Sequence, residues 1–519
     1  MIRRSELSRR SLLAGAPALG AAPKMTEGTD IVVSNAALAS EPELAVRAGA
    51  RILEAGGNAF DAAAATALAT GVLQQELCGL GGYVAAAVGI DGKTGRVWSI
   101  DANSVAPAAA RADMFRARPK TAGAAGINEN EYGVSVEDNA NVHGPLAVGV
   151  PGQLAGIGAV HERGGKLKWA EVVRPTQELV AGGFRFGNTA RSIANQRAAL
   201  GRFPATAEYL MASGTPPGAD DVWRPRDLEG TLRRIADHGW RDLYQGELGR
   251  RIADHVQALG GILTRDDMAR FEPRTSEPYR GVYHGATVYA CPLANGGLTV
   301  IEALHMLDGF DPLPASDARY WHRLAEVLKL AWRDRLRYFG DSAPVEKFLS
   351  KEYAAGRVER LRQFPGHVDK LPGPPAGTSP GTTHISAGDR DGNLVALTLS
   401  HGGLFGSCLT VPGTGIILGH GMCRFDPRPG LPNSPGPRKR PLNNVCPTIL
   451  RQPGRDVALG LRGGRRIVSV ATQLAMRVID HALAPAQAAT APRLHVEEHE
   501  PVEITDASLG ERLTAMGHQ

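Results

Sequence analysis

The stretch GTTHISAGDRDGNLVALTLS, residues 381–400, decides how this 519-residue chain folds. Apolar and β-branched residues fill both of its halves, and the turn DRDGN at 389–393 separates them. Two such runs around a glycine-containing turn are typical of a β-hairpin. Before them, residues 370–381 read KLPGPPAGTSPG, a composition that predicts a loop. A loop open to cleavage therefore runs directly into Thr382.

Two loop lengths give the hairpin different registers. A three-residue loop at 390–392, with Gly392 in the left-handed region, places Thr382 opposite Ser400. A two-residue loop would place His401 there instead. In both registers a threonine at the start of a strand gains a polar neighbour across the ladder.

Thr382 is a candidate nucleophile because of its position after the loop. Cleavage before it would create a free α-amine beside its own hydroxyl, and an N-terminal amine can serve as the general base for such a threonine. The alternative is an ordinary β-forming residue at a strand entrance. The proline- and glycine-rich flank favours the nucleophile.

Six short motifs follow one another in an order and spacing that carry more information than any one of them. They are TTHIS at 382–386, DGN at 391–393, FGS at 405–407, PGTGIIL at 412–418, KRPL at 439–442 and GG at 463–464. In these motifs the chain resembles the γ-glutamyltranspeptidase family of N-terminal-nucleophile hydrolases.

The resemblance implies an αββα four-layer sandwich over roughly residues 30–515, whereas periodicity alone supports only a mixed α/β protein. It also implies self-cleavage into a large segment, 30–381, and a small segment, 382–519, that stay associated. The family commonly has further core strands beyond the point corresponding to residue 519.

By the same resemblance, Thr382 first attacks the Gly381 carbonyl and then, as a free N-terminus, a substrate amide. Ser400 stands where the family has a threonine bonded to the nucleophile. Gly463 and Gly464 precede a predicted helix at 467–481, where free backbone N–H groups would form an oxyanion hole. Without the other motifs, these glycines would indicate only a tight turn.

The residues expected to hold the substrate depart from the family pattern. Asn103 replaces an arginine that grips the glutamyl α-carboxylate, and Asn443-Asn444 replace paired serines. Arg424 stands where an acidic residue holds the α-ammonium, and Gly402 and Gly421 stand where further polar contacts would be. An arginine repels an ammonium and attracts a carboxylate. The sequence therefore predicts an acyl group bearing a carboxylate, as in oxamate-like or dicarboxylic mono-amides. Further arginines that could assist are Arg438, Arg440, Arg462 and Arg465.

Three alternatives stay open. Arg424 could point to solvent or pair with Asp426. The pocket would then still accept γ-glutamyl amides, and the protein would be a true γ-glutamyltransferase or glutathione hydrolase. The chain could cleave itself and serve only as a binding or structural protein, against which the intact Thr382, Ser400 and 463–464 argue. A metal hydrolase is disfavoured because the chain has no HExxH, and a serine hydrolase is disfavoured because its one GxSxG match, GTSPG at 377–381, lies in the proline- and glycine-rich loop and leads into a strand, not a helix.

Composition narrows the classes of partner. Lys and Arg (58) barely exceed Asp and Glu (53), which argues against nucleic-acid binding. The five cysteines lack metal-ligand spacing, so the sequence predicts no disulfide framework, no metal and no cofactor. The expected partner is a small, anionic amide.

The first 22 residues resemble a twin-arginine signal peptide. SRRSLL at 8–13 opens a mildly apolar run that ends in small residues, which predicts export to the periplasm or the medium. No later stretch of about 18 apolar residues predicts a membrane span.

Elsewhere the pattern predicts helices at 41–57, at 58–77 with Asn58 as N-cap, and at 317–339. CGLGGY at 78–83 is no phosphate loop, because no GK[ST] and no helix follow.

Overall fold

The computed structural model describes residues 33–119, 132–211, 214–363 and 381–519. The predicted signal peptide and most of the loop before Gly381 lie outside the described residues. Of the helices within these ranges, none combines the length and the apolar character needed to cross a bilayer.

The central hairpin forms in the three-residue register. Strand β11 (Thr382–Asp389) pairs antiparallel with β12 (Leu394–Ser400), and Thr382 lies opposite Ser400. Gly392 has a φ of 84°, the left-handed conformation that the three-residue loop requires. The prediction for this register is confirmed, and the two-residue loop is wrong.

Six antiparallel strands form the sheet that carries the hairpin, in the order β1-β11-β12-β2-β3-β8. The partners of the hairpin are β1 (Ala36–Ala39), β2 (Val84–Ile90), β3 (Val97–Asn103) and β8 (Arg274–Ser276). The two strands that follow residue 381, β11 and β12, therefore lie between strands that precede it.

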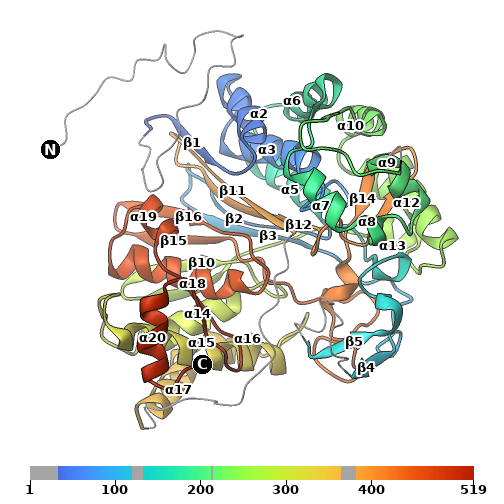
Figure 1. Cartoon of the computed structure of the whole chain (residues 1–519). Helices are drawn as coiled ribbons and strands as arrows, with labels where there is room; N and C mark the ends of the chain where they lie inside the picture. Colours follow the sequence, from blue (N-terminus) through green and yellow to red (C-terminus); the bar gives the residue numbers. More distant parts are fainter. Residues whose placement is uncertain (1–32, 120–131, 212–213, 364–380) are drawn as a thin grey trace.

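Helices cover the outer face of this sheet (Figure 1). They are α2 (Glu43–Glu54), α3 (Ala59–Leu73), α5 (Gln153–Gly164), α6 (Trp169–Gly182) and α10 (Arg226–His238). Helix α3 is almost entirely buried, because its run of alanines allows close approach to the strands and helices around it. Asn58 caps it as predicted, accepting the N–H groups of Phe60 and Asp61.

A second sheet lies against the other face of the first. Its order is β16 (Arg455–Leu459), β15 (Thr448–Gln452), β10 (Ala286–Ala290) and β9 (Tyr279–Tyr283). Side chains of β2 such as Val84 and Val88 meet Cys291 and Ile449 between the sheets. Helices α14 (Gly297–Leu307), α15 (Ala318–Tyr338) and α18 (Arg466–Asp480) cover the second sheet (Figure 1). The expected αββα four-layer sandwich is confirmed.

The remaining elements surround these layers. The helices are η1 (Glu137–Asn139), η2 (Pro145–Ala147), α7 (Asn188–Asn195), α8 (Arg197–Leu200), α9 (Pro204–Leu210), α11 (Asp242–Gln245), α12 (Glu247–Ala258), α13 (Arg265–Ala269), α16 (Val345–Leu349), α17 (Lys351–Gln363), η3 (Gly421–Arg424), α19 (Pro485–Thr490) and α20 (Ala507–Ala515). The strands are β4 (Ala117–Pro119), β5 (Val134–Val136), β6 (Phe184–Arg185), β7 (Val222–Trp223), β13 (Leu409–Val411), β14 (Ile416–Leu418), β17 (Leu494–His495) and β18 (Glu503–Ile504).

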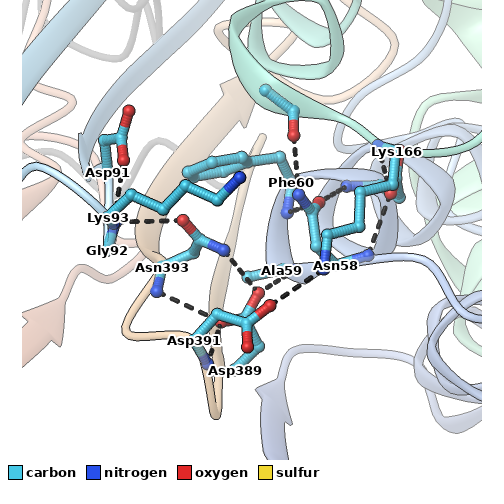
Figure 2. A network of polar contacts seen from close by, with 12 residues as sticks. Asn58, Ala59, Phe60, Asp91, Gly92, Lys93, Lys166, Asp389, Asp391 and Asn393 are labelled. Atoms are coloured by element: carbon cyan, nitrogen blue, oxygen red, sulfur yellow. Dashed lines mark hydrogen bonds and ion pairs between the residues drawn. The ribbon is translucent and has the colours of Figure 1, made fainter.

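The turn of the hairpin is anchored to α3 (Figure 2). The Asp389 carboxylate accepts the N–H of Ala59 at 2.9 Å, in the first turn of α3 where the helix dipole favours negative charge. The same carboxylate accepts the side-chain amide of Asn393 at 2.8 Å, and the Asn393 carbonyl oxygen accepts the N–H of Gly92 at 3.0 Å. One end of the hairpin is thereby fixed, and Thr382 lies at the other end.

Candidate active site

The Thr382 hydroxyl is buried and lies 3.1 Å from the Ser400 hydroxyl. Ser400 donates to the Gly381 carbonyl, which can only accept, and its oxygen accepts the N–H of Gly402 at 2.9 Å. A serine hydroxyl has a single proton to donate, so in the contact with Thr382 the donor is Thr382. The hydrogen bonds therefore run from the Thr382 hydroxyl through Ser400 to the carbonyl of the preceding residue.

The Gly381 carbonyl has a second, weaker donor, because the backbone N–H of His401 is shared between the Leu77 carbonyl at 2.8 Å and the Gly381 carbonyl at 3.1 Å. Two donors aimed at one carbonyl stabilise the negative charge that develops when a nucleophile adds to it. Gly381 has a φ of 155°, and a Cβ there would lie 2.9 Å from the Gly402 carbonyl oxygen. A glycine is required before Thr382 for both reasons.

Gly463 and Gly464 lie just before α18, as predicted. Within the described residues, neither of their N–H groups donates a hydrogen bond, so both stay available at the positive end of the helix. Gly463 and Gly381 line one pocket of about 600 Å³. The structure thus places one of the two predicted oxyanion glycines, Gly463, at the cavity that Gly381 also lines.

Three arginines line that pocket, together with Glu41 and Glu76. Arg462 and Arg466 flank the glycine turn, and Arg191 of α7 faces the same cavity. Arg462 pairs with Glu41 at 3.2 Å, and both side chains are more than half exposed. Arg191 has no ion-pair partner within the described part of the chain. An anionic group entering the pocket would find this guanidinium available.

Arg424 is buried close to the nucleophile. Its Nη2 donates to the Gly402 carbonyl at 2.7 Å, and its guanidinium lies 5.8 Å from the centre of the Tyr83 ring. Asp426 instead pairs with Arg428, at 2.6 Å. The alternative in which Arg424 points to solvent or pairs with Asp426 is therefore wrong.

The two glycines that replace polar residues leave no room for side chains. A Cβ on Gly402 would lie 2.4 Å from Nε2 of His420, and one on Gly421 would lie 2.3 Å from Oγ of Ser104. The space beside Gly402 is taken by an imidazole and by Arg424. The polar contacts that the family pattern has at these two positions cannot be made here.

Two buried histidines lie near the nucleophile; sequence reasoning missed His420 and considered His401 only as a possible partner across the hairpin. His420 Nδ1 lies 3.1 Å from the Val142 carbonyl, so Nδ1 donates and Nε2 is a lone-pair acceptor. No described residue donates to that Nε2. Burial, assisted by Arg424, holds the pKa of His420 well below its usual value, and burial lowers the pKa of His401 to about 3. Only the position of His401 directly after Ser400 could have indicated either residue.

Asn103 ends β3 and is fully buried. Its side-chain amide donates to the Pro441 carbonyl at 2.6 Å, which ties it to the KRPL motif. Its Oδ1 has no hydrogen-bond partner within the described residues. One polar atom of Asn103 is therefore left for a ligand or water.

Asn443 and Asn444 are held by the scaffold. The Asn443 amide donates to Asn295 at 2.9 Å, and its carbonyl oxygen accepts the N–H of Val445 at 3.0 Å. Asn444 accepts from Arg335 of α15 at 3.1 Å. Their predicted role as substrate contacts stays a prediction, and their observed partners position the loop.

The described residues hold no disulfide. All five cysteines are buried.

Comparison with known proteins defines the family. The family profile described as Gamma-glutamyltranspeptidase matches residues 45–519, nearly the whole chain. The chain belongs to the γ-glutamyltranspeptidase family. As a member of this family it is an enzyme of the N-terminal-nucleophile hydrolase or transferase type.

Relatives of this family member include an acylase and a glutathione hydrolase. The Acylase ACY 1 proenzyme of Pseudomonas sp. (strain V22) is 35% identical over 95% of this chain and 88% of its own length. The glutathione hydrolase proenzyme of Bacillus subtilis (strain 168) is 29% identical over 93% of this chain and 84% of its own. Among solved structures, the cephalosporin acylase from Bacillus halodurans superposes with a TM-score of 0.84 at 27% identity, covering 96% of this chain and 91% of its own.

Proposed function

We propose that this protein cleaves itself before Thr382 and then acts on amides whose acyl part bears a carboxylate. The observation that carries the proposal is the hydrogen-bonded line from Thr382 through Ser400 to the Gly381 carbonyl, with Arg424 bound to the neighbouring Gly402 carbonyl. The proposed substrate is a small anionic amide, and no cofactor is part of the proposal.

The first step is an acyl shift within the chain. The Thr382 oxygen bonds to the Gly381 carbonyl carbon while Ser400 and the His401 N–H hold the developing oxyanion. The bond from that carbon to the Thr382 nitrogen then breaks, the nitrogen takes up the threonine proton, and an ester remains. Water hydrolyses the ester, leaving a carboxylate on Gly381 and a free α-amine on Thr382.

The resulting segments, 30–381 and 382–519, remain one folded body in this proposal. Support comes from the sheet order, in which β11 lies between β1 of the large segment and β12 of the small segment. Separation would expose the ladder bonds of the central strands.

An isosteric pair of variants tests the cleavage. Thr382→Val keeps the volume and removes the hydroxyl, and Thr383→Val makes the same change one residue later, on the opposite face of the strand. We expect Thr383→Val to yield two chains on a denaturing gel, with Thr382 at the start of the smaller chain by mass analysis. Thr382→Val should stay whole, and splitting of this variant at that bond would refute the proposal.

In turnover, the free amine of Thr382 takes the proton of its hydroxyl, which then attacks the substrate amide. The N–H groups of Gly463 and Gly464 point to the oxyanion, and water or an amine releases the acyl group. The names of the Pseudomonas acylase and of the Bacillus halodurans cephalosporin acylase support cleavage of an acyl amide, and the pocket of about 600 Å³ has room for a small one.

A true glutathione hydrolase is the second candidate, since relatives near 30% identity carry that name. The geometry favours the first candidate. Arg424 stands where an ammonium would have to bind, and Gly402 and Gly421 cannot carry polar side chains.

Substrate specificity is tested at Arg424, after a gel has shown that each variant is cleaved. The substrates are γ-glutamyl anilide and anilides of oxalate, succinate and glutarate. For Arg424→Gln we expect kcat/KM on the preferred dicarboxylic anilide to fall by roughly 10- to 100-fold, the worth of a charge-assisted hydrogen bond. The control Arg428→Gln removes a guanidinium that binds Asp426, and it should change kcat/KM on the same anilide little. Efficient γ-glutamyl turnover that survives Arg424→Gln would refute the assignment.

Export through the twin-arginine route completes the proposal. It is supported by SRRSLL at 8–13 and by the small-residue end of the apolar run that follows. Replacing Arg9 and Arg10 by lysine should retain the protein inside the cell. Unchanged export of this variant would exclude the route.

A further inference from the structure

A buried cluster of potential metal ligands lies on the outer helical layer, away from the hairpin. His322 and Glu326 are one turn apart on α15, and His518 comes from the residues after α20, which packs against α15 (Figure 1). Their ligand atoms all lie within 4.8 Å of one another. Within the described residues no other group of three such side chains is as close.

A second carboxylate orients the buried histidine. His518 Nδ1 lies 2.8 Å from Glu500, and its other nitrogen, Nε2, lies 2.9 Å from Nδ1 of His322. A carboxylate that accepts the far N–H of an imidazole is the usual support of a metal-bound histidine, because it fixes the tautomer and raises the basicity of the opposite nitrogen.

The charges in the cluster favour a cation. Glu326 and Glu500 are both buried, and both bind the buried ammonium of Lys329, which lies 2.8 Å from Glu326. Two carboxylates and one ammonium leave a net charge of about −1 beside the two imidazoles, and this attracts a divalent cation.

We propose that His322, Glu326 and His518 bind one divalent transition-metal ion, with zinc as the best fit. Two imidazoles and a carboxylate are a common donor set for zinc, whose bonds of about 2.0–2.1 Å put tetrahedral ligands about 3.4 Å apart. To bind the ion, the His322 and His518 nitrogens need to separate slightly, and the Glu326 carboxylate needs to move toward them. His322 is only partly buried, whereas Glu326 and His518 are buried.

Such an ion would join the last residues of the chain to α15. Sequence spacing could not indicate the site, because 196 residues separate His322 from His518. The inference is independent of catalysis, because the cluster lies outside the two sheets, and Thr382 belongs to the first of them.

The test uses the uncut Thr382→Val protein as well as the processed enzyme, so that failure of cleavage does not affect it. After treatment with a chelator, we expect one equivalent of Zn²⁺ to bind in calorimetry and to raise Tm by a few degrees. Co²⁺ should give the visible absorption of a tetrahedral site.

Three variants make the test specific. His322→Ala removes a partly exposed ligand and should weaken Zn²⁺ binding by at least about 100-fold, and Glu500→Gln should weaken it by about 10- to 100-fold. His499→Ala removes another partly buried histidine that neighbours a glutamate but lies outside the cluster, and should bind as the parent does. Absence of binding to the parent, or equal binding by the parent and His322→Ala, would overturn the inference.

Discussion

Ser400 contributes to two successive contacts through one hydroxyl. It accepts from the Thr382 hydroxyl, 3.1 Å away, and donates to the Gly381 carbonyl, while the Gly402 N–H fixes its own oxygen. In the uncut chain Thr382 has no free amine to act as base. The serine therefore both polarises the carbonyl and receives the hydrogen bond of the attacking group.

We expect Ser400→Ala to slow self-cleavage by about 10²- to 10³-fold, because loss of an oxyanion donor has that effect on acyl transfer. Ser400→Thr keeps the hydroxyl and should cleave within a few-fold of the parent. The measurement is the half-time for appearance of the small chain on a denaturing gel. Equal half-times for Ser400→Ala and the parent would show that the hydroxyl is dispensable.

Single residues also show the limit of sequence reasoning. Thr382, Gly381 and Ser400 were predictable because a loop meets a strand and the turn fixes the register. The surroundings of Arg424 were not, because His420 fills the space beside Gly402 only once distant segments pack. Asn443 could not be recognised as a scaffold residue, since its partner Asn295 is 148 residues away.

At the level of elements, the hairpin is anchored at its turn, which is the end opposite to Thr382. Asp389 satisfies the first N–H of α3 and two N–H groups of its own turn. The sequence predicted the hairpin and the α3 cap from local patterns. It did not predict that the hairpin turn supplies an anion to the helix, because this contact spans 330 residues.

Removal of that anion should destabilise the whole sandwich. For Asp389→Ala we expect a loss of about 1–3 kcal/mol in the free energy of unfolding, since several buried donors lose their acceptor. Asp391→Ala removes a half-exposed carboxylate paired with Lys166 and should cost about 0–1 kcal/mol. Both losses are measured by urea unfolding, with each substitution introduced into the uncut Thr382→Val protein. A larger loss for Asp391→Ala than for Asp389→Ala would contradict this account.

At the scale of the whole molecule, the buried histidines make stability depend on pH. His401 keeps a pKa of about 3 because of burial, whereas the unfolded chain binds this proton near pH 6.5. The stabilising contribution of the neutral folded form is therefore complete above pH 6.5 and is lost as pH falls toward 3. The buried acids Glu76 and Glu302, whose pKa values burial raises, act in the opposite direction.

A substitution at His401 separates its contribution to the pH dependence from that of these acids. We compare the Thr382→Val protein with the same protein that also carries His401→Gln. Between pH 6 and 4 the free energy of unfolding should fall more steeply in the protein that keeps His401. The expected difference in slope is about 1.4 kcal/mol per pH unit. His238→Gln, at an exposed position on α10, should leave the slope unchanged. Identical slopes with and without His401 would show that it is protonated in the folded state.

Cleavage at Gly381 changes the kind of folding reaction that the molecule undergoes. Before the cut, β1, β11 and β12 belong to one chain, and forming the six-stranded sheet is a unimolecular event. After the cut, the same ladder joins two separate chains, so an unfolded molecule must find its partner by diffusion. The processed enzyme should refold at a rate that depends on protein concentration, whereas the uncut protein should not. The proposed self-cleavage would therefore prepare the nucleophile and, in the same step, make refolding depend on two chains that dilution keeps apart.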